Sequence, residues 1–252
     1  MVSPALSLVI PAYDEERRLG PGLRRALDYL RERGEPFEVL VVDDGSRDRT
    51  REVAATFAGE GVTLLRHERN RGKGAAIRTG LAASRGARVL LTDADFSTPI
   101  EELAKLEPHL PRAPLVIGSR GVADSSVQKR QPIYRELMGK TFNRAVRLLG
   151  VRGLNDTQCG FKLLQGDAGR QLAQELKIEG FAYDVELIWL ARRHGWNVAE
   201  VGVVWINSED SRVSPIRSSL SMLRDLLRIR WIHRHDAGAP KGGKSGAGAG
   251  QG

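Results

Sequence analysis

Short apolar runs alternate with longer stretches of helical spacing over the first half of the chain. The strand-like runs lie at residues 6–10, 37–42, 62–66, 87–92 and 115–117. The clearest helical stretches between them lie at 15–33 and 72–84. Strands that alternate with helices form a mainly parallel sheet with helices on both faces. The order of these runs therefore predicts an α/β fold with three layers around a mainly parallel sheet.

The second half of the chain is less regular. Its expected elements are a helix at 184–194, a strand at 198–206 and basic amphipathic helices near 132–150 and 216–235. The Gly-, Ala- and Lys-rich stretch 237–252 has no large apolar residue, so we expect it to be disordered. With 252 residues and no internal repeat, the sequence predicts a single domain that spans residues 1–236.

The charge balance favours a partner that carries phosphate. The chain has 39 Lys and Arg against 31 Asp and Glu, a formal net charge of +8. Such an excess suits nucleotides, nucleic acids or an anionic membrane surface. A general gain in solubility is the alternative explanation.

The chain shows no sign of export or of a membrane-spanning helix. Its one cysteine, Cys159, allows no intrachain disulfide, which fits a reducing compartment, and we expect it to be a small packed residue. Pro11 and the acids at 14–16 interrupt the first apolar run, unlike a secretory signal. No apolar stretch reaches about 18 residues. We therefore expect a cytoplasmic protein that is able to lie on a membrane but not to span it.

Four polar motifs follow predicted strands. They occupy residues 11–15, 43–46, 70–74 and 93–95. Ligands of parallel sheets bind beyond the carboxyl ends of the strands. The shared position of the four motifs therefore predicts one ligand site at this edge of the sheet.

Two acids separated by one residue, Asp93 and Asp95, follow the fourth strand. Mg²⁺ and Mn²⁺ prefer hard oxygen ligands and often take only one or two from protein, and a divalent cation neutralises a departing pyrophosphate. We therefore predict a site for Mg²⁺ or Mn²⁺ at these two acids, with a plain turn as the alternative. Asp44 is expected to converge on the same cleft and to accept hydrogen bonds from a base or a ribose.

Cations are expected to bind phosphate oxygens at the same edge. The stretch 70–74 places glycines and Lys73 at a predicted helix start, which favours an anion site, although its spacing is not that of a P-loop. A helix start with solvated cations is the alternative. Arg120 follows the fifth strand, and a guanidinium binds phosphate oxygens in a bidentate manner.

Taken in order, these motifs resemble those of the inverting family 2 glycosyltransferases of GT-A fold. The residues that carry the resemblance are 9–15, 41–46, 70–74, 93–95 and 118–120. The segments 156–162 and 181–187 resemble the dolichyl-phosphate β-glucosyltransferase branch, of which the dolichyl-phosphate mannose synthases are close relatives. The resemblance extends over about residues 5–232 and implies a GT-A (Rossmann-like) three-layer sandwich.

The resemblance also implies roles for particular residues. It implies a nucleotide pocket formed by Pro11, Ala12, Tyr13, Glu15 and Asp44. It implies metal contact through Asp95, helped by Asp93, and phosphate contacts from Arg120, Lys73 and a cation of the stretch 129–135, with Arg130 and Arg135 as candidates. Two positions depart from the family pattern: Asp14 stands where Asn is usual, and Ser97 stands where the mannose synthases can offer a further metal contact.

The implied reaction transfers a hexose, glucose first and mannose second, from a nucleotide-diphosphate sugar to a polyprenyl phosphate, with inversion. An acceptor phosphate is already anionic near neutral pH, so we expect positioning rather than a base to supply most of the catalysis. Lys162 and Arg212 are the candidates for contact with that phosphate. Asp184 is expected to orient the acceptor or a sugar hydroxyl, and Glu186 is interpreted as a helix-capping acid.

Two other functions fit parts of the sequence. A soluble transferase of the same fold would use a small-molecule or glycan hydroxyl as its acceptor, with Asp184 as the base. A non-catalytic nucleic-acid binder would use the basic charge alone. The acids at the strand ends would repel a polyanion, so we expect no nucleic-acid partner.

The basic amphipathic helices favour a lipid partner. Their cations suit lipid phosphates and their apolar faces suit the interface of a bilayer. Ordinary packing of these helices on the core is the alternative. We therefore expect the chain to act as a peripheral protein on the cytoplasmic face of a membrane.

Overall fold

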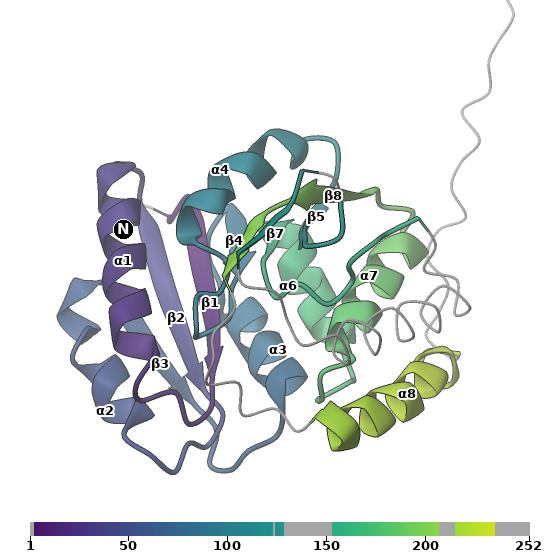
Figure 1. Cartoon of the computed structure of the whole chain (residues 1–252), viewed down its shortest axis with the longest axis horizontal. Helices are drawn as coiled ribbons and strands as arrows, with labels where there is room; N and C mark the ends of the chain where they lie inside the picture. Colours follow the sequence, from purple (N-terminus) through teal and green to yellow (C-terminus); the bar gives the residue numbers. More distant parts are fainter. Residues whose placement is uncertain (1–2, 123, 129–152, 207–214, 235–252) are drawn as a thin grey trace, which may run out of the picture.

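The computed structural model describes residues 3–122, 124–128, 153–206 and 215–234 (Figure 1). The basic helix expected near 132–150 and the tail at 237–252 lie outside these ranges. Three of the predicted site residues, Arg130, Arg135 and Arg212, also lie outside them.

The described residues form a seven-stranded sheet in the order β3-β2-β1-β4-β7-β5-β8. Its strands are β1 (Leu6–Ala12), β2 (Phe37–Asp43), β3 (Val62–Arg66), β4 (Arg88–Leu91), β5 (Leu115–Ser119), β7 (Lys162–Gln165) and β8 (Val198–Gly202). Within this sheet, β7 is antiparallel to its neighbours β4 and β5, and the other pairings are parallel. The prediction of a mainly parallel sheet is confirmed.

Helices cover both faces of the sheet (Figure 1). One layer contains α1 (Leu19–Glu32), α2 (Thr50–Ala55), α4 (Leu103–Leu106) and the short 3₁₀ turns η1 (Ala58–Glu60), η2 (Ile100–Glu102) and η3 (Glu107–His109). The other layer contains α3 (Lys73–Ala83), α6 (Gly166–Glu175) and α7 (Tyr183–Arg193), and α8 (Pro215–Ile232) packs on α7. Within the described ranges, none of these helices combines the length and apolar character needed to cross a bilayer.

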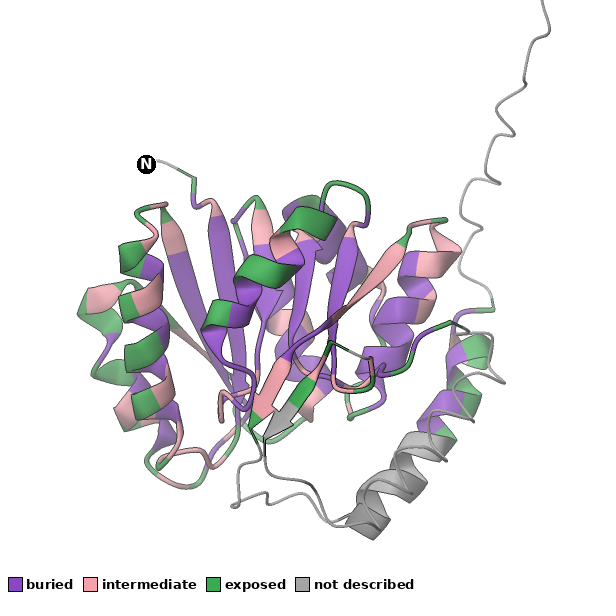
Figure 2. Cartoon of the chain, turned by 45° about the horizontal axis from the view of Figure 1, so that its top comes forward, coloured by how far each residue is buried: buried purple, intermediate pink, exposed green. Residues whose placement is uncertain are grey.

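The central strands bury both of their faces, because successive side chains point to opposite sides of a sheet. In β1, Leu8 and Ile10 pack with the α1 layer, while Val9 packs with the α3 layer. In β4, Leu90 packs with the α1 layer and Leu91 packs with the α3 layer. Figure 2 shows this buried sheet between helices whose outer faces are exposed. Burial on both sides explains why the sequence of these strands is continuously apolar.

The segment 198–206, predicted as one strand, forms two strands in different sheets. β8 ends at Gly202, and β9 (Val204–Ile206) pairs with β6 (Ser126–Gln128) in a separate two-stranded sheet. A Cβ at Gly202 would lie 2.8 Å from the backbone carbon of Asp124. Because Gly202 has no side chain, the backbone just before β6 can pass close to the end of β8. After β8 the chain leaves the edge of the main sheet.

Replacing Gly45, in the turn after β2, by Ala is expected to destabilise the fold markedly. Gly45 has a φ of 75°, and an added Cβ would lie 2.4 Å from the backbone carbon of Arg69. The left-handed φ costs about 1 kcal/mol for a residue with a side chain, and the backbone contact adds a steric cost. We expect the free energy of unfolding, measured by urea denaturation, to fall by about 2–4 kcal/mol.

Gly34→Ala is the matched control. Gly34 has a φ of 68°, but nothing lies within 4 Å of an added Cβ. It carries the backbone cost without the steric contact, so a loss of about 1 kcal/mol is expected. Equal losses in the two variants would contradict the claim that the contact with Arg69 matters.

Candidate active site

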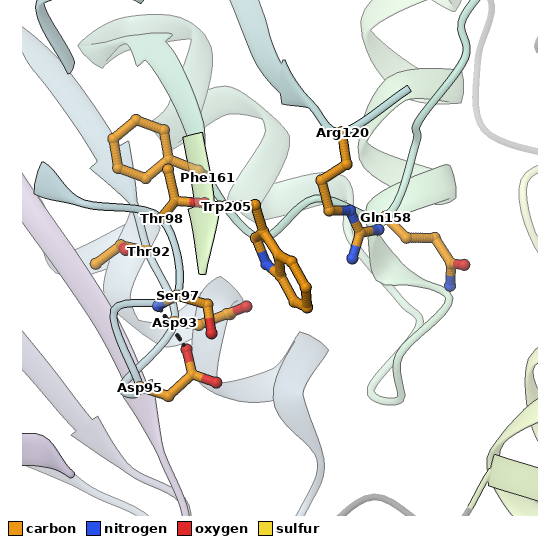
Figure 3. A pocket seen from close by; sticks show the side chains of 10 residues that line it. Thr92, Asp93, Asp95, Ser97, Thr98, Arg120, Gln158, Phe161 and Trp205 are labelled. Atoms are coloured by element: carbon orange, nitrogen blue, oxygen red, sulfur yellow. Dashed lines mark hydrogen bonds between the residues drawn. The ribbon is translucent and has the colours of Figure 1, made fainter. Parts of the chain in front are cut away.

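The carboxyl ends of β4 and β5 open onto a cavity of about 90 Å³. Asp93 and Asp95 follow β4, Arg120 follows β5, and all three side chains line this cavity. Figure 3 shows the two carboxylates on one side, Arg120 on the other and the indole of Trp205 between them. The other lining residues are Thr92, Ser97, Thr98, Gln158, Gly160 and Phe161. The predicted meeting of acids and a cation at this edge of the sheet is therefore present.

The Asp95 carboxylate is held by its own turn. Its Oδ1 accepts a hydrogen bond from the backbone N–H of Ser97 at 3.0 Å, and its Oδ2 lies 3.6 Å from the Arg18 guanidinium. Phe96, which follows Asp95, has a φ of 47°, and its N–H donates to the carbonyl of Asp93 at 3.0 Å, so the two acids lie in one tight turn. Each carboxylate oxygen has two acceptor positions, which leaves Asp95 able to bind a cation.

Asp93 is paired with Lys73 from the start of α3. The Lys73 Nζ lies 2.6 Å from the Asp93 Oδ1. Burial would raise the pKa of the Asp93 carboxyl, but Lys73, with Lys162 and Arg120 beyond it, holds that pKa below its ordinary value. Burial would lower the pKa of Lys73, but Asp93 and then Asp184 raise it instead. Both partners are therefore charged at neutral pH.

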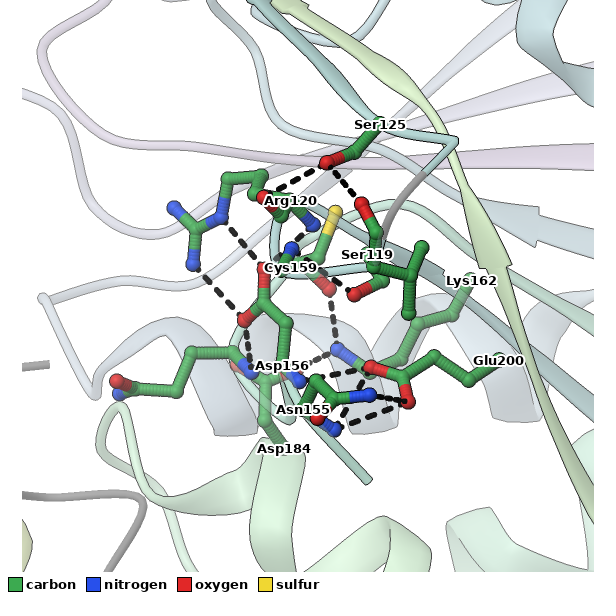
Figure 4. A network of polar contacts seen from close by, with 12 residues as sticks. Ser119, Arg120, Ser125, Asn155, Asp156, Cys159, Lys162, Asp184 and Glu200 are labelled. Atoms are coloured by element: carbon green, nitrogen blue, oxygen red, sulfur yellow. Dashed lines mark hydrogen bonds and ion pairs between the residues drawn. The ribbon is translucent and has the colours of Figure 1, made fainter. Parts of the chain in front are cut away.

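Arg120 is fixed by a bidentate ion pair with Asp156 (Figure 4). Its Nε lies 2.6 Å from Oδ2 and its Nη2 lies 3.0 Å from Oδ1. Asp156 also accepts the backbone N–H groups of Arg120 and Gln158, and Glu200 accepts those of Asn155 and Asp156. Burial would raise the pKa of the Asp156 carboxyl, but the Arg120 guanidinium lowers it. The guanidinium is therefore a fixed positive charge at the cavity wall.

Lys162 and Asp184 form a buried ion pair that does not line the cavity. The Lys162 Nζ binds the Asp184 carboxylate and the carbonyl of Cys159, and Lys162 and Asp184 are 0% and 4% exposed. Because the two groups are buried and bind each other, the predicted contacts of Lys162 with an acceptor phosphate, and of Asp184 with an acceptor or sugar hydroxyl, have no support in this arrangement and stay predictions. The pair joins β7 to α7. Cys159 is packed as predicted, and burial raises the pKa of its thiol.

Asp44 organises a loop and does not line the cavity. Its carboxylate accepts the backbone N–H groups of Arg71 and Gly72 and lies 2.6 Å from the Nδ1 of His67, and Asp44 is 3% exposed. The predicted convergence of three carboxylates on one cleft is therefore correct only for the two acids after β4. Asp44 acts on the site indirectly, since the loop that it holds carries Lys73.

The start of α3 is capped by the chain itself. Gly72 precedes the helix with a φ of 113°, and an added Cβ would lie 2.3 Å from the carbonyl oxygen of Glu179. The same carbonyl accepts the N–H groups of Gly74 and Ala75. A carbonyl oxygen therefore takes these two amides, and the predicted anion site at this helix start stays a prediction.

The motif at residues 11–15 lies close to the turn after β4, which carries Asp93 and Asp95. Pro11 and Ala12 are buried within β1, and Tyr13 is 37% exposed. Glu15 pairs with Arg18 at 2.6 Å, and Arg18 in turn faces the β4 turn. The nucleotide pocket expected from these residues stays a prediction, with Tyr13 as the member whose ring is open to a base.

The two departures from the family pattern have local explanations. Asp14 adopts a left-handed φ of 54°, and its carboxylate accepts the backbone N–H of Arg47. Asn and Asp both tolerate this backbone region and both offer a side-chain oxygen, so the turn is compatible with either. Ser97 lines the cavity and uses its backbone N–H to hold Asp95.

Glu186 caps a neighbouring segment rather than its own helix. Its buried carboxylate accepts the backbone N–H groups of Lys177 and Ile178 and lies 2.6 Å from the Nε2 of His233, next to the end of α8. Glu186 does accept backbone N–H groups, as a capping acid would. These groups belong to the segment before α7, and not to the start of α7 as predicted. Glu186 ties α8 and the loop before α7 to α7.

Sequence reasoning missed three polar or aromatic residues of the cavity wall, Thr98, Gln158 and Trp205. Gln158 lies in the segment 156–162, which the motifs had already marked as a compact polar turn. Trp205 has no local signal, because it lies within what the sequence presents as the end of one long strand. The separation of β9 from β8 is what brings its indole to the site.

Comparison with known proteins agrees with the motifs. Residues 7–164 match the model of glycosyl transferase family 2. The dolichyl-phosphate beta-glucosyltransferase of Homo sapiens is 38% identical over 241 residues, which cover 89% of this chain and 74% of the human protein. The chain belongs to glycosyl transferase family 2. It is therefore a glycosyltransferase.

Solved structures support the fold of this family 2 chain. Mannosyl-3-phosphoglycerate synthase from Rubrobacter xylanophilus matches with a TM-score of 0.70 at 20% identity, over 95% of this chain and 78% of that one. Glucosyl-3-phosphoglycerate synthase from Mycobacterium tuberculosis, in complex with Mn²⁺, UDP and phosphoglyceric acid, matches with a TM-score of 0.64 at 20% identity, over 90% and 77%. The predicted GT-A fold is confirmed.

The family 2 site fits a divalent cation whose shell is completed by substrate. In the part of the chain that the structure describes, no group of three or more His, Cys, Asp and Glu side chains is arranged to hold a metal. Asp93 and Asp95 supply two hard oxygen donors on one cavity wall, which suits Mg²⁺ when phosphates and water complete the shell. Asp93 is already paired with one cation, the Lys73 ammonium.

Asp184→Asn is expected to destabilise this family 2 chain strongly. The change leaves the fully buried Lys162 ammonium without its carboxylate. Removing one partner of a buried ion pair typically costs about 3–5 kcal/mol. Urea denaturation is the measurement, with the free energy of unfolding compared with that of the unmodified chain.

The control is Asp167→Asn, which breaks the pair of Asp167 with Arg170 at the surface, where the Asp167 side chain is fully exposed. A loss below about 1 kcal/mol is expected for such a pair. In Lys162→Met/Asp184→Leu, most of the stability should return, because both charges are gone. A stable Asp184→Asn variant would contradict the structural role given to this pair.

Proposed function

We propose that this chain is an inverting glucosyltransferase that moves glucose from UDP-glucose to a polyprenyl phosphate of the dolichyl type. The observation that carries the proposal is the lining of one cavity by Asp93, Asp95 and Arg120. Relatives named dolichyl-phosphate beta-glucosyltransferase, from 33% to 38% identical, support the sugar and the acceptor. Structures of similar fold in complex with UDP support the nucleotide.

The distribution of charge supports a diphosphate donor. Asp93 and Asp95 would hold Mg²⁺ or Mn²⁺, which when bound neutralises the departing nucleoside diphosphate. Arg120 supplies positive charge for phosphate oxygens from the opposite wall. Because Asp156 already fixes the guanidinium, it needs no reorganisation when negative charge develops.

A phosphate acceptor suits the site better than a hydroxyl acceptor. A hydroxyl needs a general base within hydrogen-bond reach, and the candidate base, Asp184, is buried and bound to Lys162. A phosphate monoester brings an oxygen that is already ionised near neutral pH, so placement in line with the bond that breaks is sufficient. Arg212 remains a candidate for contact with the acceptor phosphate, and Arg130 and Arg135 remain candidates for contact with the phosphates of the donor.

Asp95→Asn is expected to lower glucose transfer by at least about 100-fold, in line with the loss of a main electrostatic contact of a transition state. The amide is a neutral and weaker ligand, so no Mn²⁺ concentration should restore the rate. The measurement is transfer of labelled glucose from UDP-glucose to a short polyprenyl phosphate over a Mn²⁺ titration. Substantial turnover by this variant would refute the metal assignment.

The control for this experiment is Asp28→Asn, because Asp28 is an exposed acid on α1. A thermal-shift assay separates loss of function from loss of fold. The unmodified chain should be stabilised by UDP-glucose with Mn²⁺, by about 2.7 kcal/mol at a hundred times Kd. Asp95→Asn should keep its melting temperature without ligand and lose the part of the shift that depends on metal.

Contact with a membrane surface through α8 is part of the proposal. Leu226 and Ile229 of this helix are buried on α7, whereas Leu227 and Trp231 are 67% and 57% exposed. The exposed cations around them are Arg224, Arg228, Arg230 and Arg234. The packed face and the exposed apolar pair are therefore different faces of one helix. An exposed apolar pair among cations suits the interface of an anionic bilayer.

Leu227→Ser/Trp231→Ser is expected to reduce binding to anionic vesicles by roughly tenfold or more, because two apolar side chains no longer enter the interface. Sedimentation with phosphatidylglycerol-containing vesicles measures this, with neutral vesicles as the blank. Transfer to a water-soluble short-chain acceptor should be unchanged. Equal sedimentation of variant and unmodified chain would remove α8 from the proposal.

A matched pair of charge variants tests the electrostatic part. Arg224→Gln/Arg228→Gln removes two cations from α8, and Arg25→Gln/Arg31→Gln removes two from α1 at the same cost in net charge. The α8 variant should bind anionic vesicles more weakly and with less sensitivity to salt, at about 1 kcal/mol per cation. If both pairs weaken binding equally, the net charge of the chain, and not α8, attracts it to vesicles.

A further inference from the structure

Each acid of the turn after β4 faces a cation of the chain. The Lys73 Nζ lies 2.6 Å from the Asp93 Oδ1, and the Arg18 Nη1 lies 3.6 Å from the Asp95 Oδ2. Arg18 belongs mainly to Glu15, which it binds through Nε at 2.7 Å and Nη2 at 2.6 Å. Asp93 is therefore the acid whose charge is matched by a cation, and Asp95 keeps most of its charge for a ligand.

The Lys73 ammonium is held in this position by the framework behind it. The start of α3, which carries Lys73, is fixed by the carbonyl of Glu179, which accepts the N–H groups of Gly74 and Ala75. The Nζ also lies 5.7 Å from the centroid of the buried Tyr183 ring, within the range of a cation–π contact. The ammonium is thus a fixed part of the site.

The Asp93 carboxylate is confined on two sides. A Cβ added at Gly160 would lie 2.3 Å from its Oδ2 and 2.5 Å from its Oδ1, so the backbone of this glycine lies directly against the carboxylate. The Lys73 ammonium binds the Oδ1. A divalent cation on Asp93 would therefore stand close to the ammonium, on the part of the carboxylate that Gly160 leaves open. Like charges a few Å apart repel each other strongly in a partly enclosed site.

The charges around this turn give a divalent cation little attraction of its own. Most of them form ion pairs within the chain: Lys73 with Asp93, Arg18 with Glu15, Arg120 with Asp156, and Lys162 with Asp184. Asp95 is the one carboxylate of this set that lacks a matched cation within the set. A bound dication would therefore leave the set with an excess of positive charge, whereas a diphosphate that enters with the metal would offset that excess.

We propose that Lys73 is a positioning residue that competes with the divalent cation for Asp93, so that the metal binds tightly only together with the nucleoside diphosphate. The inference rests on the proposed function for the nucleotide. Without a diphosphate, the metal has to displace the ammonium or stand beside it. With a diphosphate, phosphate oxygens complete the shell of the metal and offset both positive charges. Metal and nucleotide then raise each other's affinity by the same factor.

The test measures Mn²⁺ binding from the paramagnetic resonance signal of free Mn²⁺, for the unmodified chain, Lys73→Met and Lys73→Arg. Without nucleotide, Lys73→Met should bind Mn²⁺ about tenfold more tightly than the unmodified chain, because one like charge a few Å from the dication is gone. Lys73→Arg keeps the charge and should bind Mn²⁺ as weakly as the unmodified chain. Saturating UDP should lower the Kd of the unmodified chain for Mn²⁺ by about 10- to 100-fold. In Lys73→Met this factor should be about tenfold smaller, because the metal no longer needs the diphosphate to offset the ammonium.

Arg31→Met is the matched control, because it removes a cation that pairs with Glu60 at the surface, at 2.6 Å. It should leave the Kd for Mn²⁺ unchanged, with and without UDP. Thermal shift gives a second measurement, since a ligand that binds only the folded state raises the melting temperature. At a Mn²⁺ concentration between the two Kd values and without nucleotide, Mn²⁺ should stabilise Lys73→Met more than the unmodified chain. If Lys73→Met does not fold, Lys73→Gln, whose amide can still donate to Asp93, is measured in the same way.

The outcomes separate this inference from the function on which it rests. If Lys73→Met binds Mn²⁺ without nucleotide no more tightly than the unmodified chain, Lys73 supports Asp93 and does not compete for it, and the inference is overturned. If the unmodified chain binds UDP but its Kd for Mn²⁺ is the same with and without UDP, the inference also fails. If the unmodified chain does not bind UDP at all, the proposed function fails, whereas the Mn²⁺ affinities measured without nucleotide still decide whether Lys73 competes for Asp93.

Discussion

Pairing of opposite charges between distant segments is the constraint on which the site depends. Three pairs do this at the carboxyl edge of the sheet: Lys73 with Asp93, Arg120 with Asp156, and Lys162 with Asp184. Each pair joins two parts of the chain that are at least 20 residues apart in sequence. For the buried pair of Lys162 and Asp184, a charge without its partner costs several kcal/mol. The three pairs therefore fix how the turns after β4 and β5, the start of α3 and the start of α7 lie relative to one another.

The pairs differ in what they leave open to a ligand. Lys162 and Asp184 are closed off from solvent and hold the framework. Arg120 and Asp156 are rigid, but the guanidinium still lines the cavity. Lys73 and Asp93 are more accessible, at 20% and 39% side-chain exposure. On the proposed function, a cation held by Asp93 would compete with the Lys73 ammonium for this carboxylate.

The sequence predicted the parts of this arrangement that have a local cause. Strands β1, β2, β4 and β5 bury both faces, so their apolar runs are plain in the sequence, and acids after β4 mark the strand end. The segment Lys162–Gln165 gave no strand signal, because it begins with a cation in a polar turn. Asp44 was assigned to a ligand because it follows a strand, and Lys162 because it ends a polar turn, where a charged group is usually solvated. Their true partners, Asp184 and the amides of Arg71 and Gly72, are set by packing between segments that no local pattern connects.

The end of α8 and the start of α3 are joined through one short loop. Glu186 holds the backbone of Lys177 and Ile178 and contacts His233, next to the end of α8. Two residues along, the carbonyl of Glu179 accepts the first amides of α3, and α3 carries Lys73 to Asp93. The path from α8 to Asp93 therefore runs through the Glu186 carboxylate, the backbone of residues 177–179 and the Lys73 side chain. The loop before α7 is thus the segment that contacts both Glu186, at the side of α8, and the start of α3.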